Sequence, residues 1–354
     1  LVGSEMCIRD RYNMIVKKMP ILQGFPEPDT VKFLSSVELK LSEFSPIFYD
    51  IETTGLSRYS TFVYLIGAVR HEQNLWILTQ WLAESPEEES LIIEEFTRYI
   101  QGATCTIQYN GNRFDQPYLE ERCRRNGLPS PFGELPSIDL YQSLRSCQTL
   151  FKLSRMKQPD LENLFPSIHR IHCDGGQCIR LYRSYIKKKD PSALETVLGH
   201  NQEDLCGLGS VYTLLSYKFL YLGEYEPSAV RMHGQEELVI TLALKHPVPV
   251  PVSCVTEEFY LTVNDSEAKL LLHLRDGKLR QYYPNYKDYE YLPGEDQAIP
   301  KSLSRYVDKS LRTAATPQTC YTWFCCDESF LNSRQKQMQY LTHSLPCLLK
   351  NLGK

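Results

Sequence analysis

Two acidic side chains follow a short apolar run in the stretch FYDIETTGL, which begins at Phe48. Residues 47–49 are typical of a short buried strand. Asp50 and Glu52 are one residue apart, so in a strand both project from one face while Ile51 points into the core. Like charges on one face repel unless a cation lies between them. Oxygen ligands favour Mg²⁺ or Mn²⁺, so the spacing indicates a divalent-metal site. An exposed strand end explains the pair of acids equally well.

Two further stretches place polar side chains on expected helices. In YNGNRFDQPYL, a turn at residues 110–112 leads into a helix with Asp115 in its first turn. The helix dipole favours an acid there even in a purely structural role. In LGHNQEDL, His200 and Asp204 are four residues apart and share one helix face. A single histidine in a helix is more often structural than functional.

The apolar pattern predicts a mixed-sheet α/β domain over residues 43–222. An antiparallel meander opens the domain, and later strands alternate with helices. Residues 13–42, with three prolines, are expected to be a lead-in without a core of its own, and residues 161–177 to be irregular. Strands are expected at residues 47–49, 61–69, 75–81, 104–109 and 137–140, and helices at residues 85–100, 141–156, 179–188 and 192–222.

The composition limits the class of protein. The chain has 354 residues, a net charge of −4 and a pI near 6.1. This balance argues against a strongly basic nucleic-acid binder, but not against an enzyme that binds nucleic acid locally through metal ions. Twelve cysteines occur without C-x-x-C pairs, and no secretory signal or long apolar span is present. We therefore expect a reduced, cytoplasmic protein with no membrane segment.

Two segments are expected to have no part in the chemistry. His169, His172, Cys173 and Cys178 match the spacing of no standard zinc module and are interpreted as ordinary loop residues. Residues 1–12, which begin LVGSEMCIRDR, look unlike the rest of the chain and resemble translated sequencing-adaptor sequence. We expect these residues to be a non-native leader and Met14 to be the natural start; a native N-terminal arm is the alternative.

Together, the three stretches resemble the motifs of the DEDD superfamily of 3′–5′ exonucleases, which have a ribonuclease H-like fold. DIETTGL resembles the first motif, with Asp50 and Glu52 as its acids. YNGNRFDQPYL resembles the second, with Asn110 and Asp115, and HNQEDL resembles the third, with Asp204. The resemblance covers the predicted α/β domain, and within the superfamily it is strongest to bacterial YprB-type proteins.

The resemblance implies hydrolysis of phosphodiester bonds at single-stranded 3′ ends with two divalent cations, Mg²⁺ or Mn²⁺. Two ions about 3.5–4 Å apart activate water and neutralise the charge on the phosphate. Asp50 would bridge both ions, while Glu52 and Asp204 would hold the ion that activates water. Asp115 would support the other ion through a water molecule.

The third motif departs from the pattern of the superfamily at His200. Some families have Tyr four residues before the last Asp, and others have His five residues before it. Here His200 stands at the position of the Tyr, and Gly199 at the position of the His. An imidazole can accept a proton from the attacking water, so His200 is a candidate general base.

Several residues near the motifs are expected to contact substrate or to support the site. Thr53, Gly55 and Leu56 follow the first acids, where the backbone can approach the terminal nucleotide and Leu56 can wedge against its base. Asn110 is expected to support the second motif by hydrogen bonds. Asp139, at the end of an expected strand, is interpreted as structural.

Three functions stay open at this point. The first is a metal-dependent 3′–5′ exonuclease acting on DNA or RNA. The second is a structure-selective nuclease, since ribonuclease H-like folds also support that chemistry. The third is a non-catalytic nucleic-acid-binding or scaffold protein with a degenerate nuclease fold, for which the His200 departure is the single supporting feature.

The last third of the chain is expected to be a separate module. Residues 223–234 are interpreted as a linker and residues 235–354 as a β-rich module of unknown role. Asp276-Gly277 predicts a hairpin turn within LLLHLRDGKLRQYY. The Tyr-rich stretch at residues 282–291 favours packing in a small β module, although tyrosines near cations can also stack on bases. Helices are expected at residues 300–312 and 331–345, the second ended by Pro346.

Overall fold

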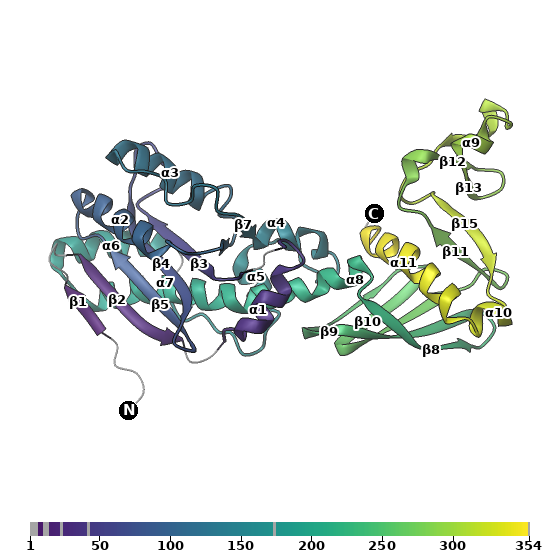
Figure 1. Cartoon of the computed structure of the whole chain (residues 1–354), viewed down its shortest axis with the longest axis horizontal. Helices are drawn as coiled ribbons and strands as arrows, with labels where there is room; N and C mark the ends of the chain where they lie inside the picture. The colour runs from purple at the N-terminus through teal and green to yellow at the C-terminus, as the bar shows by residue number, and fades with distance from the viewer. Residues whose placement is uncertain (1–5, 10–13, 22–23, 41–42, 173–174, 353–354) are drawn as a thin grey trace. The chain divides into compact units, whose positions relative to one another are not determined.

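A computed structural model describes residues 6–9, 14–21, 24–40, 43–172 and 175–352. Figure 1 labels the helices and strands. The chain divides into two compact units, the first made of Leu1–Arg145 and Arg155–Leu215 and the second of Ser146–Ser154 and Ser216–Lys354. The first unit thus ends at Leu215, earlier than the expected boundary at residue 222.

A seven-stranded mixed sheet is the centre of the first unit, with the strand order β1-β2-β5-β4-β3-β6-β7 (Figure 1). β3 is antiparallel to β4 on one side and parallel to β6 on the other. The bounds are Met6–Arg9 for β1, Ile15–Ile21 for β2, Pro46–Thr53 for β3, Val63–Glu72 for β4, Leu75–Leu82 for β5, Cys105–Gln108 for β6 and Ser137–Asp139 for β7.

β3 is buried on both faces of the sheet, which explains its nearly continuous apolar start. Tyr49 and Ile51 lie in the core cluster with Phe96 and Tyr118. Phe48 faces the opposite side, where its ring lies 5.5 Å from that of Tyr212. The alternation confirms the prediction that Ile51 points into a core and that the two acids share the other face.

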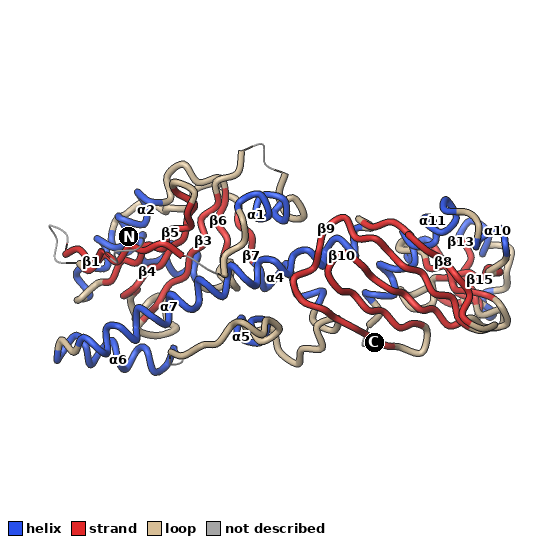
Figure 2. Tube along the Cα trace, turned by 90° about the horizontal axis from the view of Figure 1, so that it is seen from below, coloured by secondary structure: helices blue, strands red, loops and turns tan. Residues whose placement is uncertain are grey.

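Helices cover both faces of this sheet. α2 and α3 supply the core cluster on the face of Tyr49, and α6 and α7 cover the opposite face, where the ring of Tyr182 stacks on Tyr64 at 4.0 Å. Figure 2 shows α6 and α7 along one side of the sheet and α2 along the other. The bounds are Pro28–Ser35 for α1, Glu89–Tyr99 for α2, Asp115–Asn126 for α3, Leu140–Leu144 for α4, Gln158–Glu162 for α5, Gly175–Lys188 for α6 and Pro191–Tyr212 for α7.

The segments expected to lie outside the fold contribute strands to it. β1 pairs with β2 antiparallel, so the exclusion of residues 1–12 is wrong for Met6–Arg9; residues 1–5 and 10–12 lie outside the described part. β2 pairs with β5, and Met14 is fully buried. The expected lead-in is therefore part of the first unit, because its strand extends the sheet and Met14 and Ile15 pack in the core.

Two expected helices end earlier than predicted. The helix expected at residues 141–156 is only α4, followed by a 3-10 turn at Arg145–Cys147. The helix expected at residues 192–222 is α7, a 3-10 segment at Thr213–Tyr217 and α8 at Lys218–Leu222. The continuous apolar pattern does not reveal that the first unit ends inside this segment.

α7 lies directly on β4 because Gly67 has no side chain. A Cβ atom at Gly67 would lie 2.0 Å from Oδ1 of Asn201 and 2.6 Å from Cδ1 of Leu205. Within α7, Gly207 lets the carboxylate of Glu162 approach in the same way, since a Cβ there would lie 1.9 Å from Oε1. Glycine inside a helix costs roughly 1 kcal/mol relative to alanine, so close packing is the physical reason for its presence.

The second unit is rich in strands. β8, β9 and β10 form a three-stranded sheet, β11 pairs with β15, and β12 pairs with β13 and β14. β8 lies within the segment expected as a linker, so that expectation is wrong. The bounds are Tyr225–His233 for β8, Glu237–Val255 for β9, Phe259–His273 for β10, Lys278–Tyr282 for β11, Tyr289–Leu292 for β12, Gln297–Pro300 for β13, Thr313–Ala314 for β14 and Tyr321–Cys325 for β15.

The predicted hairpin turn forms, but the predicted hairpin does not. Asp276 and Gly277 have φ values of 49° and 71°, and the backbones of Arg275 and Lys278 bond to each other across the turn. β10 then pairs with β9 and β11 with β15, so the turn joins two sheets. Turn chemistry is local, whereas the choice of partner strand is not.

The helices that close the chain also differ from expectation. The helix expected at residues 300–312 is only α9 at Lys301–Ser304 and a 3-10 turn at Lys309–Leu311. After α10 at Glu328–Leu331, α11 spans Arg334–Lys350 and contains Pro346, which was expected to end it. Leu345 and Leu348 flank the proline and are buried, and their burial offsets the lost backbone hydrogen bond.

The Tyr-rich stretch packs within this unit. The rings of Tyr283 and Tyr289 stack at 5.2 Å, and the tyrosines surround a small cluster that contains Ala298 and Cys320. This arrangement agrees with the packing interpretation. No helix in the described part of the chain is both long and apolar enough to span a lipid bilayer.

Candidate active site

The acids of the first motif lie on the face of β3 that α7 covers. Glu52 is 8% exposed and Asp50 is partly buried, while Ile51 between them packs on the opposite face. The hydroxyl of Tyr64 donates to Oε2 of Glu52 over 3.4 Å. β3 therefore holds both carboxylates against a helix rather than in solvent, which excludes the exposed strand end.

α7 places His200 and Asp204 beside Glu52. Nε2 of His200 lies 3.4 Å from Oε1 of Glu52 and 3.3 Å from Oδ2 of Asp204. One ligand atom from each of the three residues lies within 4.8 Å of the other two. His200 is 7% exposed, so it belongs to the buried wall of the site and not to the surface.

Asp50 is oriented by a residue that the sequence reasoning missed. Nδ2 of Asn201 donates to Oδ2 of Asp50 over 2.8 Å. Asn201 is itself held by Gln80, whose Nε2 lies 2.8 Å from Asn201 Oδ1 and 2.9 Å from the carbonyl oxygen of Leu198. Asn201 is fully buried and follows His200 directly, so its place inside the third motif was the available signal.

Asp115 reaches β3 from the start of α3. Its Oδ1 accepts the backbone N–H of Ile51 over 3.3 Å, and Asp115 is 6% exposed. β6 pairs with β3 only as far as Phe48, so the N–H of Ile51 has no strand partner on that side. The carboxylate thus takes the place of a strand carbonyl and is fixed between the two acids of the first motif.

Burial raises the pKa of all four acids, and nearby carboxylates raise it further. Burial raises the pKa of Asp50 well above its ordinary value, and the charges of Asp204, Asp115 and Glu52 raise it further, while the Asn201 amide lowers it. Glu52 behaves in the same way, with burial first and Asp204 second. Burial raises the pKa of Asp115 to about 7. The four carboxylates therefore act on one another through space, as expected of acids that share a cation.

The negative charge of Asp204 is partly neutralised by Arg170, which lies in the segment expected to be irregular. Burial raises its pKa, and the neighbouring His200 and Arg170 lower it. Nη1 of Arg170 lies 2.6 Å from Oδ1 of Asp204, and the same guanidinium binds Glu162 through Nε at 2.6 Å and Nη2 at 2.7 Å. Arg170 thus occupies one oxygen of Asp204 and leaves Oδ2 facing His200.

The residues expected to contact substrate lie at the open end of β3. Thr53 is buried and donates through Oγ1 to the carbonyl oxygen of Gly55 over 2.9 Å. Leu56 is 87% exposed. Asn110 has a φ of 59° and donates its backbone N–H to Oδ1 of Asp139 over 2.9 Å, so it shapes the turn before α3 through its backbone.

Asp139 is structural, as expected. Its carboxylate accepts the backbone N–H groups of Asn110, Asn112, Tyr141 and Gln142, at 2.9–3.3 Å. It thus caps the N-terminus of α4 and fixes the turn that leads into the helix of Asp115.

The histidines and cysteines considered as a zinc cluster contact other groups. Nδ1 of His172 lies 2.8 Å from Oε1 of Glu203, and its ring packs on Gly199, where a Cβ would lie 2.1 Å from Nε2. Cys178 is buried in α6, and Cys173 lies outside the described residues. The cysteines in the described part of the chain form no disulfide bond.

The donor set fits divalent cations. Four carboxylates at raised pKa lie on β3, α3 and α7, and a positive charge between them would remove their repulsion. Carboxylate oxygens suit Mg²⁺ and Mn²⁺. The residues present therefore match a metal site of mainly oxygen ligands.

Comparisons with known proteins agree with this fold. A family model described as the RNase_H superfamily matches residues 47–216. The uncharacterized protein YprB of Bacillus subtilis (strain 168) is 30% identical over 179 residues, which are 49% of this chain and 42% of YprB. The chain therefore spans less than half the length of that relative.

Among solved structures, the family B DNA polymerase of Pyrobaculum calidifontis has a TM-score of 0.40 and 16% identity, over 52% of this chain and 26% of the polymerase. E. coli exonuclease I in complex with a dT13 oligonucleotide has a TM-score of 0.32 and 13% identity, over 87% of this chain and 71% of its own. The match of the family model to residues 47–216, together with the mixed sheet and its flanking helices, shows a ribonuclease H-like fold for this part of the chain.

Proposed function

We propose that this protein is a metal-dependent 3′–5′ exonuclease of the DEDD type that hydrolyses single-stranded nucleic acid. One observation carries the proposal: Glu52, His200 and Asp204, taken from two of the three motifs, converge within 4.8 Å. Asp115, from the remaining motif, binds the backbone between Asp50 and Glu52. These contacts between residues far apart in the sequence support the proposal.

Divalent cations held by these acids would neutralise the phosphate and activate the attacking water. Asp50, Glu52, Asp115 and Asp204 are the proposed ligands. Asn201 keeps Asp50 in one orientation, and Arg170 keeps Asp204 in one orientation, so neither ligand has to be ordered when a cation binds.

His200 is the proposed proton acceptor of the reaction. Nε2 is the nitrogen that faces Glu52 and Asp204, and it is therefore the atom placed to take the proton of the attacking water. The i,i+4 spacing on α7 brings His200 to the same face as Asp204. The residue thus reaches the site although its type differs from the Tyr usual at that spacing.

Incubation of the protein with 5′-labelled single-stranded DNA and RNA in Mn²⁺ tests the proposal. A ladder shortened one nucleotide at a time from the 3′ end is the expected product, and the Asp50→Asn variant should give none. Discrete internal cuts would instead indicate a structure-selective nuclease. Binding without cleavage would indicate a non-catalytic scaffold. Comparison of the two substrates also decides between DNA and RNA.

The proposal also covers the cellular compartment and the binding partner of the enzyme. We place it in the cytoplasm, as the dispersed cysteines suggest, with nucleic acid as its partner. The role of the second unit stays outside this proposal.

A further inference from the structure

The turn that follows β3 holds two large side chains in solvent. Leu56 is 87% exposed and Tyr59 is 55% exposed. Single exposed apolar residues are common and need no explanation by themselves. This turn differs because its backbone is fixed by its own Thr61 and by two side chains of α3.

Hydrogen bonds fix the backbone of the turn at Gly55 and Arg58. Oγ1 of Thr61 lies 2.9 Å from the carbonyl oxygen of Gly55 and 2.5 Å from the hydroxyl of Tyr118. The Tyr118 hydroxyl itself lies 3.3 Å from the Gly55 oxygen. Nη1 of Arg122 donates to the carbonyl oxygen of Arg58 over 3.3 Å. The turn is therefore preorganised, which lowers the entropic cost of binding a ligand on it.

Two guanidinium groups lie near the exposed ring of Tyr59. The guanidinium carbon of Arg58 is 5.3 Å from the ring centroid, and that of Arg125 is 5.8 Å from it. Nη2 of Arg58 also donates to the Tyr59 hydroxyl over 3.3 Å. Within the described ranges Arg58 has no acidic partner, and Arg125 shares the carboxylate of Glu121 with Arg124. The surface around Tyr59 is therefore positive although the whole chain carries a net charge of −4.

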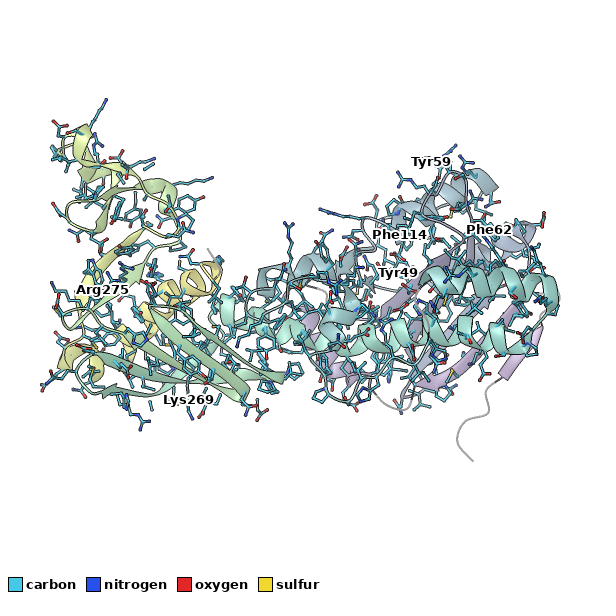
Figure 3. All side chains as sticks on the ribbon, turned by 180° about the vertical axis from the view of Figure 1, so that it is seen from behind. Tyr49, Tyr59, Phe62, Phe114, Lys269 and Arg275 are labelled. Carbon is cyan, nitrogen blue, oxygen red and sulfur yellow. The ribbon has the colours of Figure 1, made fainter. Side chains whose placement is uncertain are left out.

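α3 connects this ring to the active site and gives the separation. Asp115 begins α3, and Arg122 and Arg125 lie seven and ten residues further along it. With a rise of 1.5 Å per residue, the ring lies roughly 10–15 Å from Asp115 along the helix. A stacked strand advances about 3.4 Å per nucleotide, so this separation corresponds to about three or four nucleotides. Figure 3 shows Tyr59 at the outer edge of the unit and Phe114, which precedes α3, closer to Tyr49 of β3.

We propose that Tyr59, Arg58 and Arg125 form a stacking site for one base of a single-stranded substrate, about three or four nucleotides from the scissile bond. The ring stacks on the base, and the guanidinium groups face the neighbouring phosphates. Only a single strand offers a free base face, so the site selects single-stranded substrate. The position of the scissile bond in this inference rests on the proposed function.

Substrate length separates this site from the catalytic residues. Tyr59→Ala should raise KM for a decanucleotide by about fivefold to a hundredfold, the loss expected for one stacked base, and should leave kcat unchanged. Hydrolysis of a dinucleotide, too short to reach Tyr59, should be the same as in the wild type. Tyr59→Trp should retain tight binding of the decanucleotide. Tyr306→Ala is a matched control, because Tyr306 is also exposed and lies beside an arginine, Arg305, but belongs to the second unit.

Fluorescence anisotropy of the labelled decanucleotide with the Asp50→Asn and Asp50→Asn/Tyr59→Ala proteins gives a readout that does not depend on cleavage. Weaker binding in the double variant supports the stacking site even if the wild-type protein cleaves nothing, a result that would refute only the proposed function. Equal effects of Tyr59→Ala on both substrate lengths, or equal binding of the decanucleotide by the two proteins, would overturn the inference.

Discussion

Replacement of Asp115 by Asn should make the metal-free protein more stable, because it removes a buried charge that also lies near other acids, without removing a hydrogen bond. The amide oxygen of Asn can still accept the N–H of Ile51. The pKa of Asp115 is raised from 3.8 to about 7, which corresponds to an upper limit of about 4 kcal/mol. A raised carboxyl pKa means that the folded state binds the proton more readily, so stability falls as the pH rises from about 4 to 7. Asp115→Asn should therefore match the wild type near pH 4 and exceed it at pH 8.

The assay is urea unfolding in EDTA at both pH values. Trp76 and Trp81 both lie in β5, so tryptophan fluorescence in a Trp323→Phe background reports on the first unit alone. Addition of Mn²⁺ at pH 8 should stabilise the wild type and reverse the order of the two proteins. A variant that is no more stable than the wild type at pH 8 would refute the argument from the buried charge.

Asp139→Asn is the matched control, since Asp139 is also a buried acid close to the site. Its carboxylate accepts four backbone N–H groups, and an amide has only one oxygen to offer them. The same substitution should therefore lower stability at pH 8, by roughly 1.5–3 kcal/mol. If Asp115→Asn raises the free energy of unfolding and Asp139→Asn lowers it, the charge of Asp115 is unfavourable in the fold, whereas the charge of Asp139 is compensated by hydrogen bonds.

Three further changes test the site. His200→Ala should lower kcat by roughly 10²–10⁴ with little effect on substrate binding, and His200→Tyr should keep substantial activity; an unchanged turnover in His200→Ala, measured in Mn²⁺, would remove His200 from the mechanism. Asp50→Ala should abolish cleavage while circular dichroism shows an intact fold, and a variant with most of its activity left would exclude Asp50 as a ligand. Arg170→Ala should destabilise the first unit by about 3–5 kcal/mol, since the 2% exposed Glu162 loses its guanidinium partner and keeps the uncharged Gln158 amide. Urea unfolding of Arg170→Ala against Arg170→Ala/Glu162→Gln should show partial recovery in the double variant.

The sequence predicted the site well where its signals were local. The alternation in β3 and the i,i+4 spacing in α7 each follow from backbone geometry, so the faces that carry Glu52, His200 and Asp204 follow from their positions in the chain. The meeting of β3 with α7 came from the resemblance, because no local pattern states which helix covers which strand.

Arg170 could not be predicted, for a physical reason. It lies in a segment without periodicity, and only the fold brings its guanidinium to Asp204. The pairing of β10 and β11 failed in the same way, since Asp276-Gly277 determines a turn but not the strands that extend from it. At Pro346 the opposite happens: proline is a strong local signal for the end of a helix, but α11 continues past it because the neighbouring leucines are buried.

Gly67 has a consequence for how relatives of this protein are interpreted. Glu52 belongs to β3 and Asp204 to α7, so the distance between these two carboxylates depends on how closely α7 packs on the sheet. A Cβ at Gly67 would lie 2.0 Å from Oδ1 of Asn201, so the side chain that orients Asp50 could not keep its present position. A chain with every acidic residue intact but a side chain at this position would carry the ligands without this orientation of Asp50. The presence of the motifs alone therefore does not identify an active member, and the residue that stands opposite Asn201 must be inspected as well.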